Sequence, residues 1–275
     1  MEIHRRETDQ VTIWWLAYGA LGMFAGFCAG LLGIGGGGIM VPLLAVMFTA
    51  QQFPAEHVMH LALGTSLATI VFTSVSSLRA HHRHGAVLWP VVKAIAPGIV
   101  FGTFLGAQVV GHVTTQFLAI FFVVFMAYVS VQMILNVKPK PSRSLPGAGG
   151  MFAVGTGIGG VSALVAIGGG SLSVPFMTWC NVKVHQAIGT SAAIGFPIAL
   201  AGTAGYMVSG YGATHLPSGS LGFIFLPALT VLVLASVVMA PLGARLAHRL
   251  PVATLKRIFA GVLIFLSLKM LHSLL

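Results

Sequence analysis

The chain has 275 residues, of which 57% are hydrophobic and 7% are charged, and its mean hydropathy is +0.97. Soluble domains carry about 25% charged residues, so this composition excludes a soluble fold and indicates a membrane protein. Fourteen Lys and Arg against four Asp and Glu give a formal net charge of +10. The cations lie in short segments between apolar runs, so they report membrane topology and do not indicate a nucleic-acid partner.

The first apolar stretch, at about 13–50, would measure about 57 Å as one helix, whereas a membrane core is about 30 Å thick. Because glycines interrupt it at 33–38, we expect a full span, a sharp turn and a shorter returning helix that begins near Gly38. The stretch has no cleavage pattern of small residues, and we interpret it as a retained span. Residues 1–12 are expected to form an N-terminal tail.

Three ordinary spans are expected next, at about 61–78, 90–110 and 116–136, followed by a polar, proline-rich linker at 138–147. The same order then recurs. A glycine-interrupted stretch at about 149–180 has a returning helix that begins near Ser171, and spans are expected at about 186–208, 219–240 and 253–273. The sequence therefore predicts an all-α polytopic membrane protein with two membrane repeats, at 13–137 and 148–275, of about five segments each.

Three short motifs occur in the same order in both halves. The sequence GIGGGGIMVPLL at 33–44 corresponds to AIGGGSLSVPFM at 166–177, HLALGTSLA at 60–68 to HQAIGTSAA at 185–193, and FLGA at 104–107 to PLGA at 241–244. An odd number of segments in each repeat predicts that the two repeats lie in the membrane with inverted topology, with glycine-broken short helices near the midplane.

The distribution of Lys and Arg tests this inversion independently, because positive residues collect on the cytoplasmic side. If the repeats are inverted, the linker's side receives eleven of the fourteen: Arg79, Arg83, Lys93, Lys138, Lys140, Arg143, Lys183, Arg245, Arg249, Lys256 and Arg257. The other side receives Arg5, Arg6 and Lys269, and the Arg5-Arg6 pair runs against the rule. We therefore expect a cytoplasmic linker in a multi-pass protein of the inner (plasma) membrane.

The glycine runs at 33–38 and 168–170, each followed by Val-Pro, and the paired Gly-Thr-Ser motifs resemble the TauE/SafE family of membrane permeases. The resemblance extends over about residues 13–273. It implies a membrane transporter, not an enzyme, that exports sulfite, sulfonates or related sulfur-containing anions. The partners it implies are this small anion and the lipid bilayer, with no cofactor and no nucleic acid. Which sulfur anion is moved, the direction of transport, its proton coupling and the oligomeric state stay open.

The glycine turns also point to an anion site by their own chemistry. Glycine adopts positive φ angles, and the first N–H groups of each returning helix have no partner within the helix. A helix N-terminus carries about half a positive charge, so two such ends facing each other can hold an oxyanion without a buried arginine. The residues predicted to bind substrate in this way are Gly36, Gly37, Gly38, Gly169, Gly170 and Ser171. The alternative is that these glycines only permit tight helix packing.

A Thr-Ser pair and a histidine lie at the start of the span that follows each returning helix. The hydroxyls of Thr65, Ser66, Thr190 and Ser191 are candidate donors to the anion, and the alternative is that they bond back to helix carbonyls. His60 and His185 hold equivalent positions one turn before these motifs. They are candidates for proton coupling, or else residues of the membrane interface.

Other readings of the sequence are weaker. The four carboxylates, Glu2, Glu7, Asp9 and Glu56, all lie outside the expected membrane core, so a cation pathway has no ligands. The cluster at 81–84 contains no carboxylate or cysteine and is typical of a solvated basic loop, so no metal site is expected. The glycine run lacks the Lys-Ser/Thr ending of a nucleotide-binding loop. Cys28 and Cys180 are expected to be packing residues.

Two alternative functions remain open at this point. An intramembrane hydrolase would use Ser66 or Ser191 as nucleophile and His60 or His185 as base, but both candidates occur twice, whereas one catalytic site suffices. A passive anion channel would use the same fold as a carrier, and the sequence does not separate the two.

Overall fold

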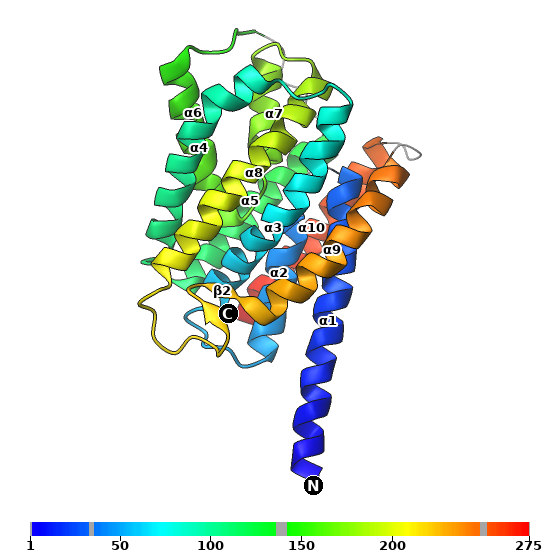
Figure 1. Cartoon of the computed structure of the whole chain (residues 1–275), viewed down its shortest axis with the longest axis vertical. Coiled ribbons are helices and arrows are strands. Elements are labelled where there is room, and N and C mark those ends of the chain that lie inside the picture. The colour runs from blue at the N-terminus through cyan, green and yellow to red at the C-terminus, as the bar shows by residue number, and fades with distance from the viewer. Residues whose placement is uncertain (1, 33–35, 136–141, 248–251, 275) are drawn as a thin grey trace.

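The structure is a computed structural model of the chain, and it describes residues 2–32, 36–135, 142–247 and 252–274. These residues form a bundle of ten helices with one short hairpin (Figure 1). The elements are α1 (Glu2–Leu32), α2 (Gly37–Ala50), α3 (Val58–Arg83), α4 (Trp89–Val110), α5 (Thr115–Leu135), α6 (Ala148–Val165), α7 (Gly170–Trp179), α8 (Val184–Ser209), β1 (Ser220–Leu221), β2 (Ile224–Phe225), α9 (Leu226–Ala247) and α10 (Val252–Leu274).

Seven stretches of these helices are long and apolar enough to cross a membrane. They are Thr12–Gly30, Val58–Arg83, Trp89–Val110, Thr115–Leu135, Ala148–Val165, Val184–Ser209 and Leu226–Gly243. The prediction of an all-α polytopic membrane protein is confirmed.

Both returning helices begin within one residue of the expected positions, α2 at Gly37 and α7 at Gly170. The residue before each helix has a left-handed backbone, with φ of 67° at Gly36 and 79° at Gly169. This conformation is costly for any residue with a Cβ, which explains why glycine occupies both turns. At about 1.5 Å per residue, these 14 and 10 residues span only part of a membrane.

The expected span at 219–240 was wrong at its start. Residues 220–225 form the hairpin of β1 and β2, because Gly219 and Gly222 take φ angles of 85° and 56° and turn the chain before α9 begins. The connection between the expected spans at 61–78 and 90–110 is shorter than predicted, because α3 continues to Arg83 and ends only before Gly85, whose φ is 65°. Residues 2–12, expected as a tail, are helical and continue into the first span.

Two helix pairs pack with their backbones almost in contact, α1 with α9 and α4 with α6. On α4, a Cβ at Gly98 or Gly102 would overlap the carbonyl of Phe152 or Thr156 on α6. On α1, a Cβ at Gly26 would overlap the backbone of Ser236 on α9. Small residues at four-residue spacing allow this close approach, which gives helices in a membrane their packing energy.

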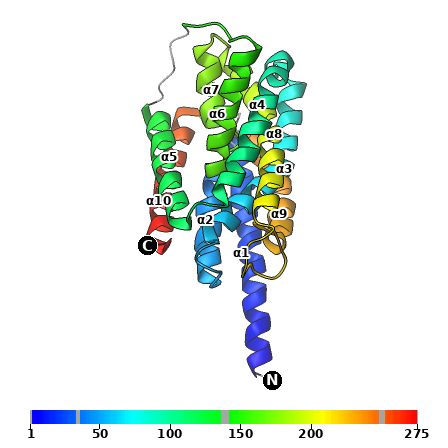
Figure 2. The ribbon, with the colours of Figure 1, turned by 90° about the vertical axis from the view of Figure 1, so that its left-hand side faces the viewer.

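These pairs are related by the correspondence between the two halves. If α1 to α5 correspond to α6 to α10, the pair α1 and α9 becomes the pair α6 and α4. In Figures 1 and 2, α2 runs from the middle of the bundle toward the end that carries the N-terminus, and α7 runs toward the opposite end. Both features support the inverted repeats, whose boundaries at 13–137 and 148–275 stay a prediction.

Candidate functional site

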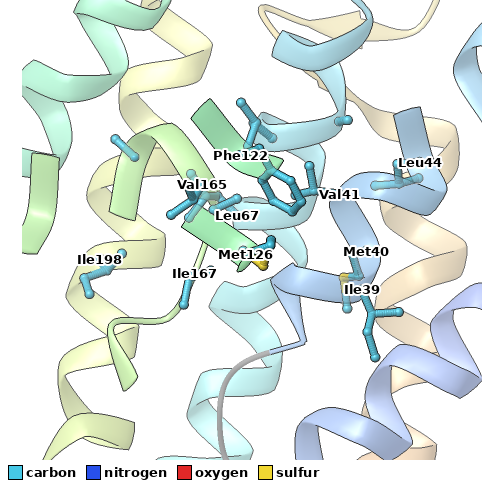
Figure 3. Packing of buried hydrophobic residues seen from close by; sticks show 14 of the residues in the cluster. Ile39, Met40, Val41, Leu44, Leu67, Phe122, Met126, Val165, Ile167 and Ile198 are labelled. Carbon is cyan, nitrogen blue, oxygen red and sulfur yellow. The ribbon is translucent and has the colours of Figure 1, made fainter. Parts of the chain in front are cut away.

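The two glycine turns meet in the middle of the bundle. Gly37, the first residue of α2, packs so closely on Ala166 that a Cβ would overlap the Ala166 carbonyl oxygen. Ala166 ends α6 with φ of 48° and begins the turn into α7. Buried apolar side chains surround the place where they meet, among them Met40, Ile167 and Met126 (Figure 3). The turn of one half therefore lies against the turn of the other in apolar surroundings.

Both helices present backbone donors at this place. The first N–H in α2 with an acceptor is that of Ile39, 3.1 Å from the Gly36 carbonyl, and in α7 it is that of Leu172, 3.1 Å from the Gly169 carbonyl. Among the described residues, which exclude 33–35, the N–H groups of Gly37, Gly38, Gly170 and Ser171 donate no hydrogen bond. Such free N–H groups are the usual anion ligands of a helix N-terminus.

The serines of the two Gly-Thr-Ser motifs lie near these turns and differ in their hydrogen bonding. Ser191 Oγ lies 2.9 Å from Ser173 Oγ, which lies 2.8 Å from the Gly169 carbonyl oxygen, so Ser191 is tied to the α7 turn. Ser66 is fully buried and its Oγ has no partner among the described residues. It lies one helical turn before Ile70, whose side chain contacts Gly37. Ser66 is thus a buried, unused hydroxyl close to the α2 turn.

Two serines of this region were missed by the sequence analysis. Ser173 connects Ser191 to the turn, and its position four residues after Gly169 was the available signal. Ser162 is 1% exposed, lies one helical turn before Ala166, and also has an Oγ without a partner in the described part of the chain. Nothing in its spacing distinguishes it from a packing residue of α6.

The threonines of the motifs hold the two halves together. Thr65 Oγ1 accepts a hydrogen bond from the Phe225 N–H at 3.0 Å, and Thr190 Oγ1 accepts one from the Leu88 N–H at 2.9 Å. Leu88 and Phe225 directly precede the corresponding helices α4 and α9. Each threonine therefore anchors the start of a helix that belongs to the other half. Their role as anion donors stays a prediction. The two hydrogen bonds give both threonines a structural role as well.

The motif glycines make these bonds possible. A Cβ at Gly64 would overlap the Phe223 carbonyl oxygen, and one at Gly189 would lie 2.6 Å from the Ala86 carbonyl oxygen. Both contacts fall two residues before the anchored N–H group. The Gly-Thr pair in each half is thus explained by a close approach followed by a hydrogen bond.

Replacing Thr65 or Thr190 by valine tests this anchoring. Valine keeps the shape and removes the acceptor, which leaves a buried N–H unpaired, and the free energy of unfolding should fall by about 1–3 kcal/mol in each variant. Thermal unfolding of the purified protein in detergent measures the change. Thr230→Val on the exposed side of α9 is the control, with an expected change within about 0.5 kcal/mol. Equal losses in all three variants would contradict the anchoring role.

The two equivalent histidines lie in different surroundings. His60 is 3% exposed, and its Nε2 lies 3.0 Å from the carbonyl oxygens of both Val110 and Val113, at the end of α4. His185 is exposed at the start of α8. A donated Nε2–H accounts for His60 structurally, and proton coupling through either histidine stays a prediction. Among the described residues, no histidine hydrogen-bonds to Ser66 or Ser191, as a hydrolase would require.

A polytopic helical bundle in which two broken half-helices meet at the centre defines a class, the membrane transporters. The chain belongs to the TauE/SafE family, because the family model described as "Sulfite exporter TauE/SafE" matches residues 18–270. The chain is 37% identical over 252 residues to a "Probable membrane transporter protein" of Haemophilus influenzae, with 91% of this chain and 95% of that protein covered.

More distant relatives carry similar names. The "Probable membrane transporter protein YunE" of Bacillus subtilis is 29% identical, over 70% of this chain and 77% of its own length. The "Probable membrane transporter protein MJ0441" of Methanocaldococcus jannaschii is 23% identical, over 91% and 93%. No solved structure matches the chain. The protein is therefore a multi-pass membrane transporter with a small-molecule substrate.

Proposed function

We propose that the protein is a carrier that exports a small sulfur-containing anion, such as sulfite or a sulfonate, across the inner (plasma) membrane. The observation that carries the proposal is the contact between Gly37 and Ala166, because it places the start of α2 against the turn that leads from α6 into α7. Each start supplies free N–H groups and about half a positive charge.

The surroundings of the turns favour an anion over a cation. The four carboxylates of the sequence lie at Glu2, Glu7 and Asp9 in the first turns of α1 and at Glu56 before α3, away from the turns. Apolar neighbours strengthen the interaction of the helix ends with a charge, because they exclude water. The unpartnered hydroxyls of Ser66 and Ser162, one helical turn from Ile70 and Ala166 in sequence, are candidate donors to an oxyanion.

The choice of sulfur anions rests on the family, whose model carries the description of a sulfite exporter. The names of the relatives say only that they are probable membrane transporters. Sulfite and sulfonates carry three oxygens on one sulfur, which suits several N–H and O–H donors converging from two helix ends. Neutral donors release such an anion more readily than a buried arginine would.

A carrier and a passive channel on this fold differ in how the anion reaches its site from the two sides of the membrane. In a carrier, one half rocks against the other so that the anion faces one side at a time. The anchoring bonds of Thr65 and Thr190 cross between the halves, so any such movement has to preserve or exchange them. Flux that saturates and shows counterflow supports the carrier; flux that rises linearly and shows no counterflow indicates the channel.

A substrate panel in proteoliposomes tests the proposed function. We expect uptake of sulfite, thiosulfate or a sulfonate such as sulfoacetate, saturating with concentration, and no uptake of sodium or ammonium in their place. Parallel assays with and without a pH gradient report proton coupling. Liposomes without protein give the background. Cation uptake that is indifferent to all of the sulfur oxyanions would overturn the proposal.

A further inference from the structure

A cavity of about 720 Å³ opens at the end of the bundle where the linker lies. It is bounded by the end of the linker at 142–145, the α7–α8 connection at 180–183, the first turn of α8, and Leu88 before α4. Its polar lining consists of Ser142, Arg143, Ser144, Asn181, Lys183 and Gln186. All of these except Gln186, which is half-buried, are exposed, so solvent enters freely.

The cavity carries two positive charges and no negative one. Arg143 is held in place, since its Cζ lies 4.9 Å from the centre of the Trp179 ring. The backbone N–H groups of Ser142 and Arg143 lie 3.2 and 3.3 Å from the Trp179 carbonyl oxygen, which docks the linker on the end of α7. Lys183 lies at the start of α8. No Asp or Glu occurs between residues 57 and 275, so these two cations have no carboxylate nearby in sequence.

The two helices that border the cavity lead to the glycine turns. α7 runs from Gly170 at the turn to Trp179 beside the cavity, and α8 starts at the cavity and passes the turn. Along this hairpin, Gln186 at the cavity is followed by Ser191, which is bonded to Ser173. Deeper on α8, Ile198 lies against Gly169. Polar side chains thus extend from the cavity toward the proposed anion site.

The corresponding place at the other end of the bundle is built differently. There the α2–α3 connection and Phe225, which corresponds to Leu88, bring three aromatic rings together. The ring centres of Phe48 and Phe53 are 4.9 Å apart, and that of Phe225 lies 5.0 Å from Phe53 and 5.8 Å from Phe48. The segments at 48–57 and 210–225, which form this place, contain no Lys or Arg. The place beside the linker is therefore open and cationic, and its counterpart is filled with aromatic side chains.

We propose that the linker-side cavity is an anion-loading vestibule, a second and weaker binding site for the transported sulfur oxyanion. Arg143 and Lys183 concentrate the anion there before it moves along α7 and α8 to the glycine turns. An open pocket lined by charges of one sign raises the local concentration of the opposite ion and its rate of arrival by about tenfold or more. The anion identity rests on the proposed function, whereas the charge preference of the vestibule does not.

The charge preference is measured with a single reporter cysteine in the full chain. Burial raises the pKa of the Cys180 thiol and makes it a slow reporter, so Ser144→Cys is introduced with Cys28 and Cys180 replaced by alanine. An anionic and a cationic methanethiosulfonate of similar size are compared. We expect the anionic reagent to react about tenfold faster relative to the cationic one than it does at Ser218→Cys, on the opposite end.

The charges themselves are then removed. Arg143→Gln with Lys183→Gln should bring the ratio at Ser144→Cys close to that at Ser218→Cys, whereas Arg83→Gln, an exposed arginine at the same end that does not line the cavity, should leave it unchanged. Methanesulfonate should slow the modification of Ser144→Cys and should not do so in the double variant. In proteoliposomes the double variant should raise KM for the anion about tenfold with an unchanged kcat.

The outcomes separate this inference from the proposed function. The vestibule would be overturned if the ratio of the anionic to the cationic reaction rate were the same at Ser144→Cys and Ser218→Cys. It would also be overturned if Arg83→Gln lowered this ratio at Ser144→Cys as much as the double variant does. A clear anion preference with protection by methanesulfonate supports the vestibule even if no sulfur anion is transported, in which case the proposed function alone fails.

Discussion

Gly37→Ala is expected to lower the rate of anion transport by about 10- to 100-fold, through a strain of about 1–3 kcal/mol at the place where the two turns meet. The added methyl group would overlap the carbonyl oxygen of Ala166, and neither backbone can retreat without moving the start of α2 or the turn before α7. Separating these two segments also separates the two sets of N–H donors. Transport of radiolabelled anion into proteoliposomes measures the loss.

A matched control distinguishes this effect from damage to the fold. Gly261→Ala places the same methyl group on α10 where no atom lies within 4 Å, and it should leave transport unchanged. Gly169→Ala tests the turn of the other half, because Gly169 has φ of 79° and its Cβ would lie 2.6 Å from Ile198 Cδ1. All variants are compared at equal membrane yield and as monodisperse protein in detergent. Wild-type transport by well-folded Gly37→Ala would show that the turns only pack helices.

The glycine turns were predictable from the sequence for a physical reason. A stretch of 38 apolar residues is too long for one crossing, and only a run of glycines can reverse the chain inside it. The structure places the returning helices at Gly37 and Gly170, as the sequence led us to expect. The inverted topology, which the distribution of Lys and Arg along the chain also indicates, stays a prediction.

The roles of individual polar residues were harder to predict. Thr65 and Thr190 were expected to face an anion, but their hydroxyls accept N–H groups from segments 160 and 102 residues away in the chain. No local spacing reveals a partner at that distance. The hairpin at 220–225 was missed because its apolar residues continue the hydropathy of α9, and only the positive φ angles of Gly219 and Gly222 separate it.

The sequence repeat also concealed a difference between the two ends of the bundle. His60 and His185 occupy equivalent positions, yet His60 is buried against the end of α4 and His185 is exposed. Likewise, Arg143 and Lys183 border an open cavity, whereas the equivalent end is closed by Phe48, Phe53 and Phe225. A repeat specifies the backbone of both halves. The residues that differ between its two copies determine whether each end of the bundle is open or closed.

The proposed single anion site depends on an inverted arrangement of the two halves, and the sidedness of two exposed serines tests this arrangement. Ser142 lies where the linker meets α7, and Ser218 lies in the segment between α8 and the hairpin. With eleven of the fourteen basic residues on the linker's side, Ser142 should face the cytoplasm and Ser218 the opposite side. Each is replaced by cysteine in a chain without Cys28 and Cys180.

The measurement is labelling by a membrane-impermeant thiol reagent in intact cells, repeated after the membrane has been permeabilised. Ser218→Cys should be labelled fully in intact cells, and Ser142→Cys only after permeabilisation. A parent chain without cysteine gives the background. Labelling of both positions in intact cells, or of both only after permeabilisation, would contradict the inverted repeats and with them the single anion site built from two turns.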